Sequence, residues 1–347
     1  MDDEVSIEVE EYRRTVRAVL RRAGASERDA CSQTELLLDG DLRGHSSHGV
    51  RRLPVLVERM RNGLIVTDAD IRVEWRTDSF ASVDGGWGFG ATVAEAAVDA
   101  VVRRADRTGV AVAAVRRANH IGMLAPHVER IAGAGQVGLA LTTSEALVHP
   151  WGGSRALVGT NPIGIAVPTT GEPLVVDMST ASVSMGKILD HLGRAQPIPA
   201  GWAVDEHGRP TTDAAAATRG AISPFGGSKG YALGVAFEAL VAVLTGTGLG
   251  TDVRGTLDTT EPTTKGDLFL AVSLERLGLQ GTLPALTAYL EQLRASGAGG
   301  GAPVSVPGDR SRAVRALRLA EGVPLHRATW AATRALIGPD PLEAPHA

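Results

Sequence analysis

The chain has 347 residues, of which 44% are hydrophobic, 21% are charged and only 4% are aromatic, and its formal net charge is −4. This length predicts two compact units, and the composition is that of an ordinary folded protein. The acidic balance excludes nucleic acid as a partner, because binding to phosphates needs basic surfaces. A single cysteine cannot form an internal disulfide and the acidic first residues do not resemble a signal peptide, so we expect a cytoplasmic protein.

The N-terminal part of the chain predicts helices. Apolar residues recur at helical spacing over residues 4–24, and Ser26 has the position of an N-cap for a second helix. A further helix is expected over residues 50–61. If the second helix continues through residues 41–52, four polar side chains fall on one of its faces: Asp41, His45, His48 and Arg52.

From residue 71 onward the apolar pattern changes to that of short strands separated by helices. Strands are expected at residues 71–85 (two runs), 109–115, 136–143, 164–168, 174–179 and 267–274, with a helix over residues 91–105. This alternation predicts an α/β fold beside the helical N-terminal unit. The long apolar run from Gly230 contains Glu238, so it predicts a buried helix and no membrane span. The glycine-rich residues 295–309 predict a mobile loop.

The segment GHSSHGVRRL, residues 44–53, gathers groups that suit a 2-oxo acid. A histidine can pass a proton near neutral pH, and an arginine one turn away can hold a carboxylate through two parallel hydrogen bonds. Two alternatives stay open on the residues alone. One is a solvated polar helix face, and the other is a metal site of Asp41 with the two histidines, which the charge of Arg52 would oppose.

Two glycine-containing motifs flank the third predicted strand. The match to G-x-G-x-x-A at Gly86, with Asp106 twenty residues later, formally fits a dinucleotide fingerprint. Asp106 precedes the next strand instead of ending it, which favours a plain glycine-rich turn; in a Rossmann fold, Arg116 and Arg117 could bind an NADP phosphate. The sequence NHIGM, residues 119–123, places a histidine and a glycine at a strand end, where they could face a ligand or simply form a turn.

Two later motifs contain residues that are typical of turns or of helix N-termini. GTNPIG, residues 159–164, could offer Thr160 to a substrate oxygen. GGSKGY, residues 226–231, places Lys229 and free N–H groups at a helix N-terminus, which favours an anion but lacks the spacing of a P-loop. An ordinary glycine-rich helix start is the alternative for this second motif.

Several ordered motifs together resemble the malate/L-lactate dehydrogenase-like oxidoreductase family, which includes sulfolactate and ureidoglycolate dehydrogenases and piperideine- and pyrroline-carboxylate reductases. The motifs are DLRGHSSHGVRRL, NHIGM, HPWGGSRALVGTNPIGIAVP, DMSTASVSMGKI, IPAGWAVDEHGRPTTD and GGSKGY. The resemblance covers about residues 5–275. It implies a homodimer whose α/β domain binds NAD or NADP, with NADPH favoured, without a Rossmann fold. The implied units are a helical N-terminal part (1–68), a cofactor-binding α/β domain (69–290) and a C-terminal loop and helices that return to the helical domain (291–347).

The resemblance also implies roles for individual residues. Ser47 and His48 match a proton donor with its serine relay, Arg52 matches the carboxylate clamp and Thr160 matches a substrate contact. His120 matches a residue that is the proton acceptor in some members and part of the cofactor pocket in others. The other matches are cofactor contacts: Gly122, Ser144, Met178, Ser179, Thr180, Lys229, Pro307 and Gly308. No metal is expected.

The expected reaction is hydride transfer between nicotinamide and C2 of a small carboxylic acid that carries a 2-oxo or 2-hydroxy group. The first alternative is an NADPH-dependent reductase of cyclic imines of the piperideine- or pyrroline-2-carboxylate type. A redox-inactive binding homologue and a Rossmann dehydrogenase are the remaining alternatives.

Overall fold

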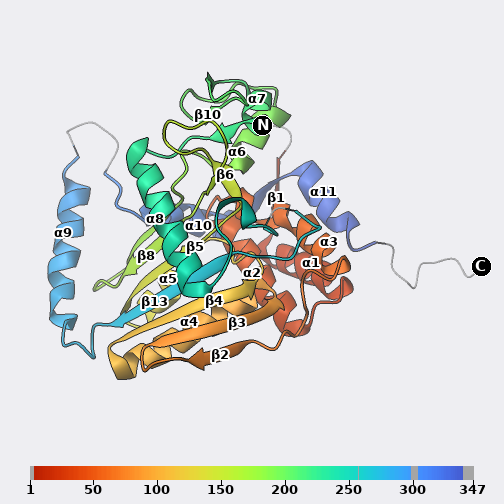
Figure 1. The fold of residues 1–347 in the computed structure, drawn as a ribbon. Helices are drawn as coiled ribbons and strands as arrows, with labels where there is room; N and C mark the ends of the chain where they lie inside the picture. Colours follow the sequence, from red (N-terminus) through yellow and green to blue (C-terminus); the bar gives the residue numbers. More distant parts are fainter. Residues whose placement is uncertain (1–3, 257, 298–303, 339–347) are drawn as a thin grey trace, which may run out of the picture.

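A seven-stranded sheet forms the centre of the molecule in the computed structural model, which describes residues 4–256, 258–297 and 304–338 (Figure 1). The strand order is β2-β3-β4-β13-β5-β8-β9. These strands are β2 (Arg72–Trp75), β3 (Phe80–Gly88), β4 (Val110–Ala118), β5 (Gln136–Thr142), β8 (Ile163–Val167), β9 (Leu174–Met178) and β13 (Gly266–Ser273). Strands β3 and β4 run parallel and the other neighbouring pairs of this sheet are antiparallel. The predicted strands and the α/β class are confirmed.

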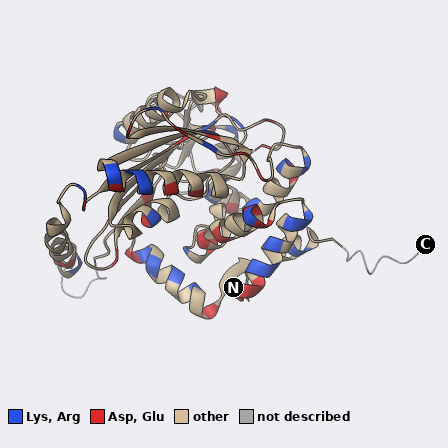
Figure 2. Ribbon diagram, turned by 90° about the horizontal axis from the view of Figure 1, so that it is seen from below, with Lys and Arg blue, Asp and Glu red and all other residues tan. Residues whose placement is uncertain are grey.

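Helices cover both faces of this sheet. Side chains alternate between the faces of a strand, so Phe269 and Ala271 of β13 face one layer and Leu268 faces the other. The first layer consists of α4 (Gly90–Thr108) and α5 (Ala125–Gly133), and the second contains α8 (Ser228–Thr245). Acidic and basic residues are interspersed on the helices around the sheet (Figure 2).

The N-terminal helices pack together with the C-terminal part of the chain. They are α1 (Val9–Arg22), α2 (Glu27–Leu42) and α3 (Leu53–Arg61), and they share one apolar core with β14 (Val323–His326) and α11 (Arg327–Ala335). Tyr12 stacks on Trp330 with ring centres 6.0 Å apart. Ser26 caps α2 by accepting a hydrogen bond from the Asp29 backbone N–H, as predicted. The domain division at residues 68 and 290 stays a prediction.

The prediction of one helix over residues 4–24 is wrong at its start. Residues Glu4–Ile7 form strand β1, which pairs antiparallel with β14 near the other end of the chain. Helix α10 (Asp309–Glu321) contacts α2 and β14. It follows α9 (Leu283–Ala295) in the chain. Residues 298–303 of the expected mobile loop, 295–309, lie outside the described residues.

A second, smaller sheet and two helices form a unit that the sequence did not predict. Its strand order is β11-β10-β12-β6-β7, and it lies at the top of Figure 1. Its elements are β6 (Ala146–Val148), β7 (Val158–Gly159), α6 (Met185–Gly193), β10 (Ala203–Val204), β11 (Pro210–Thr211), α7 (Ala214–Arg219) and β12 (Ala221–Ile222). Strands of two or three residues carry no readable period, which is why the apolar pattern did not reveal them.

The helix does not continue through residues 41–52, so the condition for one shared polar face is not met. Helix α2 ends at Leu42, and Gly44 adopts φ +81°, a left-handed conformation that ends helices. Two short 3₁₀ turns follow, Ser46–His48 and Val50–Arg52. The carboxylate of Asp41 accepts the Val50 N–H at 2.7 Å, so it stabilises the turns instead of sharing a helix face with the histidines.

The prediction that the long apolar helix is buried holds for one face of α8 only. Glu238 and Val241 are buried against the rest of the protein, but Val243 on the opposite face is 78% exposed. By length and composition α8 could cross a membrane, a criterion that core helices of soluble proteins also meet. The carboxylate of Glu238 accepts hydrogen bonds from Gly159 and Asn161, which attach this helix to the loop that carries Thr160.

Candidate active site

A cavity of about 540 Å³ brings many of the predicted residues together. Its walls come from residues 44–52, the turn after β4, the ends of β5 and β9, and helix α6. The predicted site residues that line it are Ser47, His48, Arg52, His120, Gly122, Ser144, Thr160, Met178 and Ser179. Segments far apart in the sequence therefore converge on one space of the size that binds small molecules.

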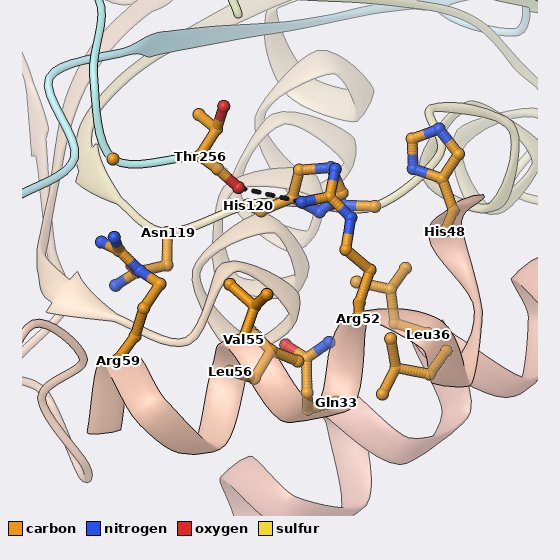
Figure 3. A pocket seen from close by; sticks show the side chains of 13 residues that line it. Gln33, Leu36, His48, Arg52, Val55, Leu56, Arg59, Asn119, His120 and Thr256 are labelled. Carbon is orange, nitrogen blue, oxygen red and sulfur yellow. Dashed lines mark hydrogen bonds between the residues drawn. The ribbon is translucent and has the colours of Figure 1, made fainter. Parts of the chain in front are cut away.

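The guanidinium of Arg52 is the centre of the site. Its Nε donates to the Ser47 carbonyl at 3.1 Å and its Nη1 donates to the Thr256 carbonyl at 2.9 Å. Its Nη2 lies 3.2 Å from Nε2 of His120, and Figure 3 shows the guanidinium beside the imidazole. Burial lowers the pKa of Arg52 to about 10, which leaves the group charged at neutral pH. The backbone carbonyls fix the plane of the guanidinium while Nη2 stays directed at His120.

The backbone around His120 determines which ring nitrogen carries its proton. The Gly122 N–H donates to Nδ1 at 3.1 Å, so in the neutral ring Nδ1 is the acceptor and Nε2 carries the hydrogen. Burial, followed by the charge of Arg52, holds the pKa of His120 well below its usual value. Two donors, Nε2–H of His120 and Nη2–H of Arg52, then face each other. An oxygen acceptor such as a carboxylate would satisfy both donors.

His48 lies beside these two groups. Its ring stacks on that of His120 with centres 5.4 Å apart and an interplanar angle of 20°. Burial and then the charge of Arg52 lower the pKa of His48 to about 3, and its buried Nδ1 has no hydrogen-bond partner among the described residues. The hydroxyl of Ser47 makes no hydrogen bond to this ring within the described chain, so the serine relay stays a prediction.

A network of hydroxyl groups holds Thr160 at the cavity wall. The Thr160 N–H donates to Oγ of Ser144 at 2.8 Å, and the two side-chain oxygens are 3.0 Å apart. Thr180 does not line the cavity, but its N–H and hydroxyl both donate to the Thr160 carbonyl. Asn161 has a left-handed φ of +30° and donates to the buried Glu238 at 2.6 Å. The sequence predicted Thr160 and missed this support for it.

Sequence reasoning also missed the residue that holds the turn before His120. The buried Asn119 accepts from Arg59 of α3 and donates to the carbonyls of Trp87 and Gly88. Arg59 in turn donates to the carbonyls of Asp258 and Glu261 and to the Thr263 hydroxyl. Figure 3 shows Arg59 next to Asn119, on the far side of Val55 from Arg52. An arginine one turn beyond Leu56 on an otherwise apolar helix face was the available signal.

Three further acidic or basic residues around the cavity were not predicted. Glu145 accepts the Thr256 N–H at 2.8 Å, which places the carbonyl that holds Arg52. Asp177 accepts the N–H groups of Leu124 and Ala125 at the start of α5, and burial raises its pKa to about 6. Lys265 lines the cavity and makes a buried ion pair with Asp267.

Four predicted cofactor contacts do not line this cavity. Thr180 supports Thr160 as described, and Lys229 is exposed in the first turn of α8. The carbonyl of Pro307 accepts the Val175 N–H at 3.3 Å, and Gly308 precedes the first residue of α10. Their roles in cofactor binding stay predictions.

The glycine motif at Gly86 has a packing role. A Cβ on Gly90 would lie 2.0 Å from the His120 carbonyl oxygen, so only glycine lets α4 begin this close to the NHIGM turn. Asp106 accepts a hydrogen bond from Gln136, and Arg117 pairs with Asp84. Neither Asp106 nor Arg117 lines the cavity.

Asp41 does not belong to a metal site with the two histidines. It is 1% exposed and accepts from the Tyr12 hydroxyl at 2.8 Å as well as from Val50. Burial raises the pKa of this carboxyl to about 6. Within residues 4–256, 258–297 and 304–338, no three His, Cys, Asp or Glu side chains lie close enough together to hold a metal ion.

Known proteins with related sequences are dehydrogenases and cyclic imine carboxylate reductases. The chain is 35% identical over 322 residues to the malate/(S)-sulfolactate dehydrogenase of Methanothermus fervidus, covering 92% of this chain and 94% of the relative. It is 38% identical over 234 residues to the (2R)-3-sulfolactate dehydrogenase (NADP(+)) of Chromohalobacter salexigens, covering 67% of this chain and 70% of the relative.

Solved structures of a dehydrogenase and a reductase have the same fold as this chain. A dehydrogenase from Sinorhizobium meliloti is 45% identical, with a TM-score of 0.92 over 96% of this chain and 98% of that chain. The Δ1-piperideine-2-carboxylate reductase from Pseudomonas syringae is 29% identical, with a TM-score of 0.87 over 96% of this chain and 99% of that chain. Residues 7–334 match the family described as malate/L-lactate dehydrogenase. The chain therefore belongs to the malate/L-lactate dehydrogenase family.

Proposed function

We propose that the protein transfers a hydride between a nicotinamide cofactor and C2 of a small 2-oxo or 2-hydroxy carboxylic acid. The observation that carries this proposal is the arrangement of Arg52, His120 and His48. A charged guanidinium lies 3.2 Å from one imidazole, a second imidazole stacks on the first, and all three groups line one cavity. This set provides a carboxylate clamp and two groups that can hold a proton.

The cavity lining fits a nicotinamide dinucleotide, which carries phosphates and many hydroxyl groups. Basic side chains outnumber acidic ones in the lining, and nine hydroxyl side chains offer hydrogen bonds: Ser46, Ser47, Thr142, Thr143, Ser144, Thr160, Ser179, Ser184 and Thr256. The relatives are dehydrogenases and reductases, and one of them is named for NADP(+), which supports the preference for NADPH. We infer that the cofactor binds at the predominantly antiparallel sheet, and not at a Rossmann βαβ unit. When bound, the cofactor supplies or accepts the hydride.

We infer that the substrate carboxylate binds between Arg52 and His120. One carboxylate oxygen would accept from Nη2 of Arg52 and from Nε2 of His120, the two donors that face each other. This contact would fix the substrate relative to the cofactor and exclude water from the guanidinium.

Substrate binding would also change the proton affinity of His48. Burial is the largest cause of its low pKa and the charge of Arg52 is the second, so an anion on Arg52 offsets the second cause and raises the pKa. A protonated His48 could then give its proton to the oxygen on C2 as that oxygen gains negative charge. The proton donor would therefore become available only when an anionic substrate is in place.

A reductase of cyclic imines is the alternative, supported by the structural likeness to a piperideine-carboxylate reductase. A cyclic imine can bind already protonated on nitrogen and then needs no proton from the protein. The experiment is a substrate panel of 2-oxo acids and cyclic imine carboxylates with NADH and NADPH, repeated on His48→Asn. Loss of 2-oxo acid reduction with retained imine reduction would identify His48 as the acid. Absence of activity on every substrate with both cofactors would contradict the proposed function.

We also propose that the protein is a homodimer, with the apolar face of α8 as the surface that a second copy covers. The exposed large side chains of this face are Leu233, Val235, Leu240, Val243 and Leu244. Apolar patches of this kind on soluble proteins mark interfaces. Sedimentation analysis should give a dimer for the wild type and a monomer for Leu240→Glu, and a monomeric wild type would contradict this part.

A further inference from the structure

The charge of the cavity differs from that of the whole chain. The lining contains five basic side chains, Arg51, Arg52, Lys187, Arg194 and Lys265, and two carboxylates, Asp177 and Asp190. The chain as a whole has a formal net charge of −4. A cavity with an excess of positive charge in an acidic protein attracts anions.

Most of these basic groups already have a partner or a proposed role. Arg194 makes an ion pair with Asp190 at 3.3 Å, Lys265 is paired with Asp267, and Arg52 faces His120. Arg51 and Lys187 differ from them, because within the described part of the chain neither makes an ion pair or a side-chain hydrogen bond. Both side chains belong to exposed residues of the lining, so their charges are available to a ligand.

Arg51 and Lys187 come from two different segments of the cavity wall. Arg51 belongs to the turn that also carries Arg52, whereas Lys187 is in the first turn of α6. The two segments approach each other closely, since a Cβ on Gly186 would lie 3.1 Å from Cβ of Ser47.

His45 also lines the cavity, close enough to Lys187 for their charges to interact. Burial lowers its pKa, and the charges of Arg310 and Lys187 lower it further. The imidazole of His45 therefore lies near positive charges of both α6 and α10.

We propose that Arg51 and Lys187 form a second anion subsite of the cavity, which binds an anionic group other than the carboxylate held by Arg52. This inference rests on the proposed function. The group would be a carboxylate, a sulfonate or a phosphate, all of which accept charge-assisted hydrogen bonds from guanidinium and ammonium groups. Its source is either the distal acid group of a dianionic 2-oxo acid or a phosphate of the nicotinamide cofactor.

The test uses the full-length protein with Arg51→Gln, Lys187→Gln and the double variant. The matched control is Arg103→Gln, which removes the same charge from an exposed position on α4, outside the cavity lining. The first arm compares KM for oxaloacetate, a dianion, with KM for 2-oxobutanoate, a monoanion. The second arm measures equilibrium binding of NADH and NADPH by fluorescence titration, which needs no turnover.

If the subsite holds the substrate, the double variant raises KM for oxaloacetate at least tenfold more than KM for 2-oxobutanoate. If it holds the cofactor pyrophosphate, the dissociation constants of both NADH and NADPH rise at least tenfold. If it holds the additional phosphate of NADPH, only the dissociation constant of NADPH rises by that amount. Any of these results supports the subsite, with the control within twofold of the wild type.

Changes below twofold in both arms would overturn the subsite. That result leaves the proposed function intact if the wild-type protein remains active. A wild-type protein that reduces no 2-oxo acid contradicts the proposed function, and the binding arm still decides the subsite. A wild type that binds neither cofactor and reduces neither acid overturns both.

Discussion

Residues 44–53 and residues 86–91 are both rich in glycine or histidine, but the structure gives them different roles. In the first segment, Arg52 and His48 line the cavity, where Nη2 of Arg52 faces a ring nitrogen of His120 and the buried Nδ1 of His48 has no hydrogen-bond partner among the described residues. In the second, Gly90 packs against the backbone of His120. One segment provides chemical groups, and the other permits the close packing that places them.

The difference between the two segments lies in hydrogen bonds and not in motif spacing. Arg52 has a donor facing another donor, which is unfavourable until a ligand accepts from both. Arg59, seven residues later, is buried with carbonyl, amide and hydroxyl acceptors around it, so it stabilises the turn before His120. Substitutions in the two segments should therefore affect different measurements.

The largest effect is expected for His48→Asn. Asparagine cannot give a proton at this position, so kcat for 2-oxo acid reduction should fall about 1000-fold, within the range measured for general acids. Equilibrium binding of NADPH should stay within about threefold. His207→Asn, in an exposed turn, is the control. A kcat for His48→Asn within tenfold of the wild type would remove His48 from the catalytic role.

Arg52→Ala should reduce kcat/KM for 2-oxo acids by about 100-fold, chiefly through KM, because a charge-assisted contact to the carboxylate is lost. Arg52→Lys should recover only part of this loss, since lysine keeps the charge and lacks the forked donor geometry. Steady-state kinetics with the exposed Arg61→Ala as control will measure the effect. Equal kcat/KM values for Arg52→Ala and the control would show that the carboxylate binds elsewhere.

Gly90→Ala tests the packing role of the second segment. The new methyl group would meet the His120 carbonyl at 2.0 Å, so the backbone must shift, and we expect unfolding free energy to fall by about 3 kcal/mol. Gly133→Ala in α5 is the matched control, because a Cβ there meets nothing within 4 Å. Chemical denaturation compares the two. Equal stability of these variants would contradict the packing argument.

Asp41→Asn should change how stability depends on pH. The pKa of Asp41 is about 6 in the folded protein and near 3.8 when unfolded, so between these values the folded state binds more protons. The contribution of this group to stability therefore falls by about 2 kcal/mol as the pH rises from about 4 to about 6. Denaturation of the wild type and the variant at several pH values should show this slope in the wild type only. The same slope in both proteins would exclude Asp41 as its source.

The sequence predicted those helices and strands that are determined by residues close together in the chain. Helical spacing identified the buried face of α1, Ser26 identified the start of α2, and short apolar runs identified the strands of the central sheet. The fold of residues 4–7 depended on a strand partner more than 300 residues away, which no local pattern contains. The turn at Gly44 required knowing that this glycine adopts a positive φ.

The candidate site was predictable as a set of residues and not as a geometry. Motifs identified Arg52, His48 and His120. The sequence also placed Asp41 on the same helix face, whereas in the structure its carboxylate binds the backbone of the turns at Val50. The supporting residues Arg59, Asn119 and Glu145 were missed, because each acts by a contact with a segment distant along the chain. Arg51 and Lys187 were missed for the same reason, since α6 reaches the 44–52 segment only in three dimensions.

The coupling between Arg52 and His48 can be measured most directly as proton uptake when a monoanionic substrate analogue binds. Calorimetric titration with oxamate at pH 6.5, in buffers that differ in ionisation enthalpy, gives the number of protons taken up per site. An anion on Arg52 should raise the pKa of His48 from about 3, so the wild type should take up protons and His48→Asn should not. No uptake by the wild type, or equal uptake by both proteins, would contradict the account.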